Sequence, residues 1–344
     1  MVAWMFNGFD ARFPKPRQTG TPLARPMSCI VLATVAVLSC VPAVAQPYPS
    51  RAIRLLVGSA AGGAVDISAR VVGKKLSESL GQPVVIENRI GASGNIALGA
   101  VAKSPPDGYT LLMTSSVIAL PSLFPNITFN ATKDLAPISL VAIGPSLLVS
   151  HPSLPVKNVQ QLIAFAKVRP KQVVYGSAGF GTLTHLPMEL LMSSTGIDMT
   201  HVPYKGGSLS IVGLLSGEVH VLFSSLPGAL SHVKQQRLRA LAVSTAKRSS
   251  ALPDVPTIAE VAVRGFDTSS WYGIVGPAGI PKPIVDLLST EAAKIVRSRE
   301  VREGFVRDGF EPEGTTPAAF AAFIRSEINK YEEIIRRSNI KPVE

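Results

Sequence analysis

The chain has 344 residues, of which 34 are basic and 23 acidic, and its formal net charge is +11 at pH 7. This charge favours an anionic partner, but the basic residues are dispersed and aromatic residues make up only 6% of the chain, so a stacking surface for nucleic acid is not expected. Both cysteines, Cys29 and Cys40, lie within the first 45 residues, which excludes disulfides, thiolate nucleophiles and cysteine metal sites from the remainder. We therefore expect a small anion as the ligand, and no nucleic acid, metal or cofactor.

The N-terminal segment has the pattern of a secretory signal peptide, residues 1–45. Residues 29–41 form a largely apolar run that is too short to span a bilayer, with basic residues before it and Ala-Val-Ala at 43–45 after it. We predict cleavage after this tripeptide and export to the periplasm, with Met5 or Met27 as alternative first residues. Lipidation of Cys40 is another alternative, although the residues before it are a poor approach to a lipid-attachment cysteine. No later run reaches the roughly 20 apolar residues of a membrane helix, so the exported part is not expected to span a membrane.

The first predicted strand, residues 53–57, leads into a loop of small residues, Gly-Ser-Ala-Ala-Gly-Gly-Ala-Val-Asp at 58–66. Beyond the loop, apolar residues recur every three to four positions up to Gly81, which predicts a helix. A loop that opens a helix leaves several N–H groups without intrahelical partners, and small side chains let a ligand reach them. The segment therefore predicts an anion site, such as a carboxylate site. A tight turn that binds nothing is the plainer alternative.

The next predicted elements are a strand at residues 84–87, a short helix that follows the glycine-rich segment 91–95, and a strand at 109–114. Thr114 and Ser115 place hydroxyl groups at the carboxyl end of the last strand. Open α/β sheets bind ligands at this end, so both residues are candidates for ligand contact.

A long apolar stretch, residues 137–151, predicts a strand that leaves one domain and enters another. A strand at 173–175 then leads into a second glycine-rich loop at 176–182 and a helix from Thr182 to about Thr195. Neither loop fits a nucleotide fingerprint, and the two loops could face one another. The other predicted elements are helices at 158–168, 209–215, 281–298 and 317–338, and strands at 199–202, 219–223, 238–244 and 271–276.

The alternation of strands and helices predicts a doubly wound α/β protein. About 299 residues follow the leader, since 45 of the 344 belong to it, and this length suggests two domains.

A series of short motifs then identifies a family. They are GGAVD at 62–66, VIENRIGASG at 85–94, PDGYTL at 106–111, HPSLP at 151–155, GFGT at 179–182, HVPYKG at 201–206, LRALAV at 238–243 and LPDVPT at 252–257. In this order they resemble the Bug family of solute receptors, the periplasmic binding proteins of tripartite tricarboxylate transporters, over residues 48–344. The resemblance implies a periplasmic binding protein type 2 clamshell of two α/β domains joined by two crossover strands. Domain 1 would comprise residues 46–147 plus 271–344, and domain 2 residues 148–270.

The resemblance also implies a ligand held in the cleft by backbone amides and bridging waters. Carried over to this sequence, three groups of residues would contact it. They are Ser59, Ala60, Ala61, Gly62 and Gly63 with Asp66; Ser177, Ala178, Gly179, Gly181 and Thr182 with His185; and Tyr204, Lys205 and Gly206. Plainer roles exist for three of them: Asp66 as a helix cap, His185 as a partner of a loop carbonyl, and Lys205 as a surface charge.

Two departures from the family pattern affect the ligand. The first loop has Ser59, Ala60 and Ala61 where the family usually has an aromatic residue and prolines, which suggests a roomier pocket or a looser loop. Ser224 stands where many members carry an aspartate that could pair with a ligand ammonium. Its absence argues for a plain carboxylic acid and against an amino acid.

The predicted function is therefore that of a monomeric, non-enzymatic receptor that delivers a small carboxylate to membrane permease subunits. A ligand-sensing co-receptor of a membrane sensor protein is the first alternative, because a closed clamshell can be recognised by either partner. An exported hydrolase is the second. The five histidines show no metal spacing, no Gly-x-Ser-x-Gly turn is present, and Ser244 and Lys247 fit a Ser-x-x-Lys pattern without its companion motifs.

Overall fold

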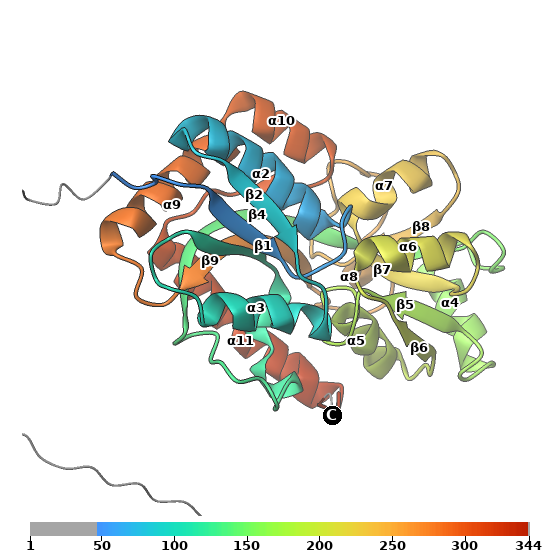
Figure 1. Cartoon of the computed structure of the whole chain (residues 1–344). Helices are drawn as coiled ribbons and strands as arrows, with labels where there is room; N and C mark the ends of the chain where they lie inside the picture. The colour runs from blue at the N-terminus through green and yellow to red at the C-terminus, as the bar shows by residue number, and fades with distance from the viewer. Residues whose placement is uncertain (1–46, 343–344) are drawn as a thin grey trace, which may run out of the picture. The chain divides into compact units, whose positions relative to one another are not determined.

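The computed structural model describes residues 47–342, so the predicted leader lies outside the described residues (Figure 1). The first half of the sheet is built around β1 (Ile53–Val57), which pairs in parallel with β2 (Val84–Asn88) and β3 (Thr110–Thr114). β9 (Ser269–Pro277) pairs antiparallel with β3 and extends this half. The three predicted N-terminal strands are confirmed to within one residue.

The long strand β4 (Leu135–Ser150) connects the two halves of the sheet. Its first part, up to Pro145, pairs with β9, and Ala142 and Ile143 also pair with the short β10 (Glu311–Pro312). From Ser146 onward it pairs instead with β7 (Val221–Ser225) and β8 (Arg239–Val243). The long strand predicted at residues 137–151 is therefore confirmed.

The second half of the sheet adds β5 (Val174–Ser177) and β6 (Thr200–Pro203), which pair in parallel beyond β7. The helices of this half are α4 (Val159–Lys167), α5 (Leu186–Thr195), α6 (Gly207–Leu215), α7 (Leu226–Lys234) and the one-turn α8 (Ile258–Val261).

The first half carries α2 (Ala64–Leu80), α3 (Asn95–Ala102), α9 (Lys282–Arg297), α10 (Arg299–Arg307) and α11 (Pro317–Arg337). Short 3₁₀ turns are η1 (Ala92–Gly94), η2 (Ser116–Ala119) and η3 (Pro121–Leu123). α2 forms where the spacing predicted it, burying Ala69, Val72 and Leu76, and it ends at Gly81, whose φ of 68° suits a residue without a Cβ atom.

Helices cover both faces of each half, as a doubly wound fold requires. On one face of the first half, side chains of α2 and α9 form one apolar cluster with β1, while α3 and α11 form a second cluster on the other face. In the second half, α4, α5 and α8 share one cluster and α6 and α7 share another.

Four helical segments differ from the sequence predictions. The helix predicted from Thr182 begins at Leu186, because residues 182–185 form turns in which the amide of His185 donates to the carbonyl of Thr182. α7, α8 and α10 were not predicted. α7 starts directly at the end of β7, and α10 is separated from α9 by Ser298 alone, so neither has a loop before it to mark its start.

Candidate functional site

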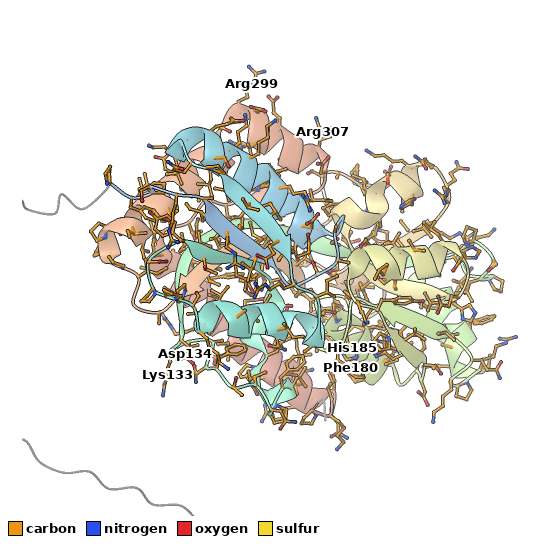
Figure 2. The ribbon with its side chains drawn as sticks, viewed as in Figure 1. Lys133, Asp134, Phe180, His185, Arg299 and Arg307 are labelled. Carbon is orange, nitrogen blue, oxygen red and sulfur yellow. The ribbon has the colours of Figure 1, made fainter. Side chains whose placement is uncertain are left out.

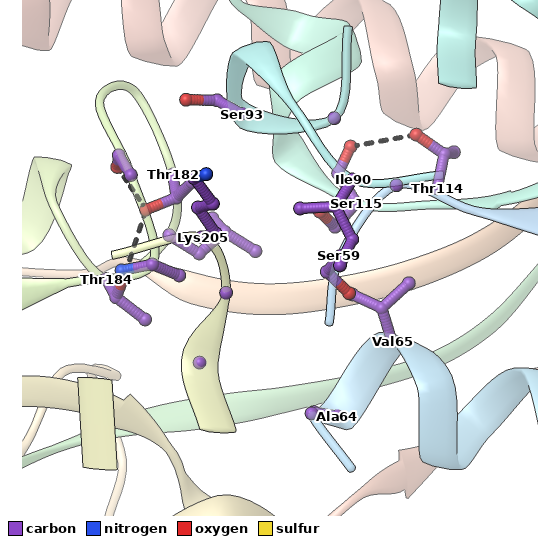
Figure 3. A pocket seen from close by; sticks show the side chains of 18 of the residues that line it. Ser59, Ala64, Val65, Ile90, Ser93, Thr114, Ser115, Thr182, Thr184 and Lys205 are labelled. Carbon is purple, nitrogen blue, oxygen red and sulfur yellow. Dashed lines mark hydrogen bonds between the residues drawn. The ribbon is translucent and has the colours of Figure 1, made fainter. Parts of the chain in front are cut away.

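The candidate site is a cavity of about 370 Å³ that draws its lining from both halves of the sheet (Figure 3). The first half contributes the loop before α2, the turn η1 and the end of β3. The second half contributes the loop after β5 and the segment that opens α6. Both glycine-rich loops line this cavity, so the prediction that they face one another is confirmed.

The predicted site residues divide into two groups by position. Those that line the cavity are Ser59, Gly63, Thr114, Ser115, Ala178, Gly179, Thr182, Tyr204, Lys205 and Gly206. Those that are not part of the lining are Ala60, Ala61, Gly62, Asp66, Ser177, Gly181, His185 and Ser224. The neighbouring Ser225 lines the cavity where Ser224 was expected, because side chains alternate along β7. Ligand contact by the first group stays a prediction.

The first loop presents free backbone donors to the cavity. α2 has no side-chain cap, and its first helical hydrogen bond runs from the amide of Ile67 to the carbonyl of Gly63. The amides of Ala64 and Val65, which both line the cavity, therefore have no intrahelical partner. Ser59 adds a hydroxyl whose oxygen is buried and has no hydrogen-bond partner within residues 47–342. This end of the cavity combines the positive end of a helix dipole with unpaired polar atoms.

Asp66 supports this loop from behind the cavity lining. Its buried carboxylate accepts hydrogen bonds from the amide of Gly62 (2.9 Å), the guanidinium of Arg70 (2.8 and 3.0 Å) and the side chain of Asn88 (3.0 Å). Burial alone would raise the pKa of Asp66, but these hydrogen bonds outweigh it and hold the pKa below its usual value. The carboxylate therefore fixes the turn at Gly62, whose φ is 79°.

The second loop uses most of its amides internally, which differs from the expectation of free donors. The amide of Ala178 donates to the hydroxyl of Thr184 (2.7 Å), that of Gly179 to the hydroxyl of Ser177 (3.1 Å), and that of Gly181 to Nδ1 of His185 (3.3 Å). This loop therefore offers mainly side chains to the cavity. Two of them are Phe180, which is 39% exposed, and Thr182.

A cluster of aromatic rings lies beneath the second loop and supports it. His185 and His201 pack with ring centroids 4.5 Å apart, and Phe180 lies 5.0 Å from His185 and 4.8 Å from His201. Figure 2 shows Phe180 and His185 together at this loop. Nε2 of His201 lies 2.7 Å from the hydroxyl of Ser177, while its Nδ1 is buried without a partner in the described part of the chain. Burial, with the nearby His185, lowers the pKa of His201 to about 3, so this imidazole is neutral.

Glu189 completes the cluster. Its carboxylate accepts a hydrogen bond from the hydroxyl of Tyr175 and lies 3.4 Å from Nε2 of His185. Nδ1 of His185 accepts from the loop, so Nε2 is the nitrogen that donates to Glu189.

The start of α6 is the second source of backbone donors. No side chain caps this helix, and its first helical hydrogen bond runs from the amide of Ser210 to the carbonyl of Gly206. The segment contacts the first loop directly: the hydroxyl of Ser208 donates to the carbonyl of Ala61 (2.9 Å). The N-termini of α2 and α6 thus meet at one end of the cavity, one from each half of the sheet.

Lys205 is the one charged side chain among the described residues that line the cavity. It is exposed, and Figure 3 labels it among the residues that line the cavity. It takes part in none of the ion pairs formed within residues 47–342. The site therefore carries net positive charge and favours an anion.

Several lining residues were not among the predicted site residues. The turn at 91–94 lines the cavity with Ser93 among its residues, and its small-residue pattern is the same signal that marked the two predicted loops. Apolar side chains also line the cavity; they include Val65, Ile90, Leu98, Leu112, Met113, Phe124, Phe180 and Leu183. They carry no separate signal, because an apolar residue that faces a cavity has the same sequence pattern as one that faces the core.

In residues 47–342, no group of three or more His, Cys, Asp or Glu side chains is placed to hold a metal ion. In the same range, no helix is both long enough and apolar enough to cross a membrane.

Comparisons with known proteins agree on one family. Residues 68–340 match the model of the tripartite tricarboxylate transporter family receptor. Protein BugT of Bordetella pertussis is 38% identical over 315 residues, which cover 91% of this chain and 96% of BugT.

Solved structures give the same result. Rpa4515 of R. palustris with adipate is 36% identical, with a TM-score of 0.84 over 86% of this chain and 100% of that one. MatC from Rhodopseudomonas palustris with bound malate is 29% identical, with a TM-score of 0.80 over 84% of this chain and 100% of that one. These matches confirm the predicted α/β clamshell fold of periplasmic binding proteins.

Proposed function

This chain belongs to the tripartite tricarboxylate transporter family of receptors, and on that premise we propose that it captures a small carboxylate outside the cytoplasm and delivers it to the membrane subunits of a transporter. The observation that carries the proposal is the meeting of two uncapped helix N-termini, α2 and α6, at one cavity that also holds Lys205. Such an arrangement stabilises a negative charge through backbone N–H groups and helix dipoles. The carboxylates bound to Rpa4515 and MatC support the same class of ligand.

The ligand is a plain acid and not an amino acid. Of the described side chains that line the cavity, none is an aspartate or a glutamate, so a ligand ammonium would have no anionic partner. Ser224 itself does not line the cavity, so the preference for a plain acid rests on the lining as a whole and not on that position.

The two halves of the sheet act as two domains, residues 46–147 plus 271–344 and residues 148–270. β4 changes its partners at Ser146, and β9 begins at Ser269, close to both boundaries. A carboxylate bound by α2 of one domain and α6 of the other draws the domains together, because its contacts on both sides exist only in the closed form. The transporter subunits then recognise the closed, loaded receptor, which works as a monomer.

The receptor works in the periplasm after removal of the predicted leader. Support comes from the pattern of residues 1–45 and from the family, whose members serve as receptors for a membrane transporter.

A hydrolytic function is disfavoured by the state of the one serine and histidine pair that the described residues place near the cavity. Ser177 is fully buried behind the lining, and its hydroxyl is already bonded to Gly179. His201 is a weak base, because its pKa is lowered to about 3, and its Nδ1 has no orienting carboxylate among the described residues. We therefore expect ligand-dependent stabilisation and no turnover of ester or amide substrates.

A thermal-shift screen of carboxylic acids on protein that begins at Gln46 tests the function. A binder shows a melting temperature that rises with ligand concentration. Ser59→Ala should weaken binding by about tenfold or more, since one hydrogen bond to a charged group is lost. Ser116→Ala is the matched control, because its hydroxyl is likewise buried without a partner in residues 47–342 but does not line the cavity. If no carboxylic acid shifts the melting temperature, or if both variants bind equally to the parent protein, the proposed site is wrong.

Deletion of the gene for this protein distinguishes a role in transport from a role in sensing. Delivery to a transporter predicts that the deletion abolishes uptake of the acid. A purely sensory role predicts unchanged uptake and loss of induction of the genes that respond to the acid.

A further inference from the structure

The cavity opens to solvent between the two halves of the sheet. Among the residues that line it, the exposed ones are Ile90 and Ala92 of the first half and Phe180, Pro203 and Lys205 of the second. The other lining residues are buried or half-buried. The opening between these two groups of exposed residues is called the mouth below.

The two halves come very close together at two places beside the mouth. A Cβ atom at Gly179 of the second loop would lie only 2.9 Å from Oγ of Ser93 in η1. A Cβ atom at Gly206 would lie 3.0 Å from the backbone of the first loop. Ser93 directly follows Ala92 in the chain, and Gly206 directly follows Lys205, so both contacts adjoin residues of the mouth.

One hydrogen bond joins the halves at the second of these places. The hydroxyl of Ser208, the second residue of α6, donates to the carbonyl of Ala61 in the first loop (2.9 Å). Neither residue lines the cavity. Ala61 is exposed and Ser208 is half-buried, so water can hydrate both groups when they separate. This contact can therefore break and form again at low cost.

The contact between α5 of the second half and α11 of the first half is of a different kind. Leu186 of α5 is buried in the same apolar cluster as Ile334 and Ile335 of α11. The hydroxyls of Ser193 and Ser338 also lie 2.8 Å apart between these helices. Separation of α5 from α11 would bring buried apolar side chains into water, which is unfavourable. The halves should therefore part at the mouth while α5 and α11 stay together.

We propose, resting on the function proposed above, that Ser208 is the latch of the closed receptor. Its hydrogen bond to the first loop forms when the two halves close at the mouth, and it breaks before a bound carboxylate leaves. Ser208 does not touch the carboxylate. It is a positioning residue that holds the N-terminus of α6 at the first loop and thereby slows release.

Stopped-flow fluorescence measures uptake and release separately. A dye on Val212→Cys reports binding, since Val212 is exposed on α6 and does not line the cavity. Protein that begins at Gln46 has no other cysteine. The probe is adipate, replaced by the acid with the largest effect in the thermal-shift screen if adipate has none. Ser208→Ala should raise the dissociation rate constant by about fivefold and leave the association rate constant within about twofold.

Two further variants control for the loss of a serine. Ser208→Thr keeps the hydroxyl and should release the probe at the rate of the parent protein. Ser216→Ala removes a hydroxyl from the far end of α6 that bonds within the helix, to the carbonyl of Gly213, and should also leave release unchanged. Equal dissociation rates in Ser208→Ala and Ser216→Ala would overturn the latch and leave the receptor function intact. If no carboxylic acid binds the parent protein, the proposed function fails and the latch fails with it.

A disulfide across the same contact tests whether the mouth opens here. A Cβ atom at Gly62 would lie 4.0 Å from Cβ of Ser208, within the range of about 3.5–4.5 Å found in disulfides. The double variant Gly62→Cys with Ser208→Cys should take up no radiolabelled probe when it is oxidised empty, and release none when it is oxidised loaded. Reduction should restore both. Because Gly62 has φ of 79°, a cysteine there is strained, but the strain is present in the reduced reference as well. Unchanged exchange of the probe in the oxidised protein would show that the halves part elsewhere.

Discussion

The two glycine-rich loops begin with the same device and then diverge. In the first loop the amide of Gly62 donates to the side chain of Asp66, and in the second the amide of Gly181 donates to the side chain of His185. In both, a glycine with φ of 79° or 68° is held by a side chain four residues later. Both supporting side chains were predicted to contact the ligand, and both lie behind the cavity lining.

The loops differ in the distance from this glycine to the next helix. α2 begins two residues after Gly62, so its first amides open onto the cavity. After Gly181 the chain makes further turns before α5 begins at Leu186, and the amides of Ala178 and Gly179 are already bonded within the loop. A loop of small residues thus indicates a close approach of backbone and ligand only where the next helix begins within about two residues of the glycine that is held by a side chain. In this protein the donor partner of the first loop is the start of α6.

The largest effect should come from breaking the contact between the first loop and α6. Gly206 has φ of 139°, and a side chain there would come within 3.0 Å of the amide nitrogen of Ala60. Gly206→Ala should therefore push α6 away from the first loop and weaken carboxylate binding by about 100-fold, measured by calorimetry. Gly304→Ala is the control, because a side chain there would meet no atom closer than 3.7 Å and the residue does not line the cavity. Unchanged affinity in Gly206→Ala would mean that the loop after β5, and not the start of α6, supplies the second set of backbone donors.

The support of the first loop should show in stability and in its pH dependence. Asp66→Ala leaves the amide of Gly62 without its buried partner and should lower the free energy of unfolding by about 2 kcal/mol at pH 7. The lowered pKa of Asp66 means that its contribution is complete above the usual carboxyl pKa of about 4 and is lost as the pH falls through the lower folded-state value.

Urea unfolding at pH 7 and pH 3 measures this change. The difference between the variant and the parent protein should narrow at pH 3. Asp286→Ala, which removes an exposed ion pair with Lys282, should change stability by less than about 0.5 kcal/mol at either pH. A pH-independent gap for Asp66→Ala would mean that the ionised carboxylate is not what supports the loop.

Periodicity and turn residues were enough to predict most of the fold, because the elements that carry the site have clear boundaries. α2 has a three-and-four apolar spacing and a glycine stop, and the apolar run of β4 could be read as one strand. The residues that form the site were harder to predict from the sequence. Whether an amide is free depends on a side chain that folds back from four residues later, as His185 does onto Gly181, and this choice between capping and ligand contact has no sequence signature.

The aromatic cluster beneath the second loop should make stability depend on pH in a different range. The folded-state pKa of His201 is lowered to about 3, so the unfolded chain takes up a proton below its usual pKa of about 6.5 while the folded protein does not. Stability therefore falls as the pH drops from about 6.5 toward 3. His201→Phe keeps a ring beside Tyr175 and removes the titrating group. Between pH 7 and pH 5 the variant should therefore lose about 1 kcal/mol less free energy of unfolding than the parent protein, a figure that allows for the partial exposure of His201.

Thermal melts at the two pH values measure this difference. An identical pH profile in His201→Phe and the parent protein would contradict a protonation cost in this cluster. The second loop would then be supported by packing alone.

The smallest effect should come from Lys205, whose side-chain charge adds to the positive ends of α2 and α6 at the cavity. It is exposed, so solvent and salt screen its attraction for a carboxylate. Lys205→Gln should weaken binding by about threefold to fivefold at low salt, and the gap should close as salt is raised, whereas Lys205→Arg should retain most of the affinity. Calorimetry at two salt concentrations separates the two contributions, because the amides of α2 and α6 act at short range and remain in the variant. A loss well above tenfold that persists at high salt would show that the side chain, and not the backbone of the two helix starts, holds the carboxylate.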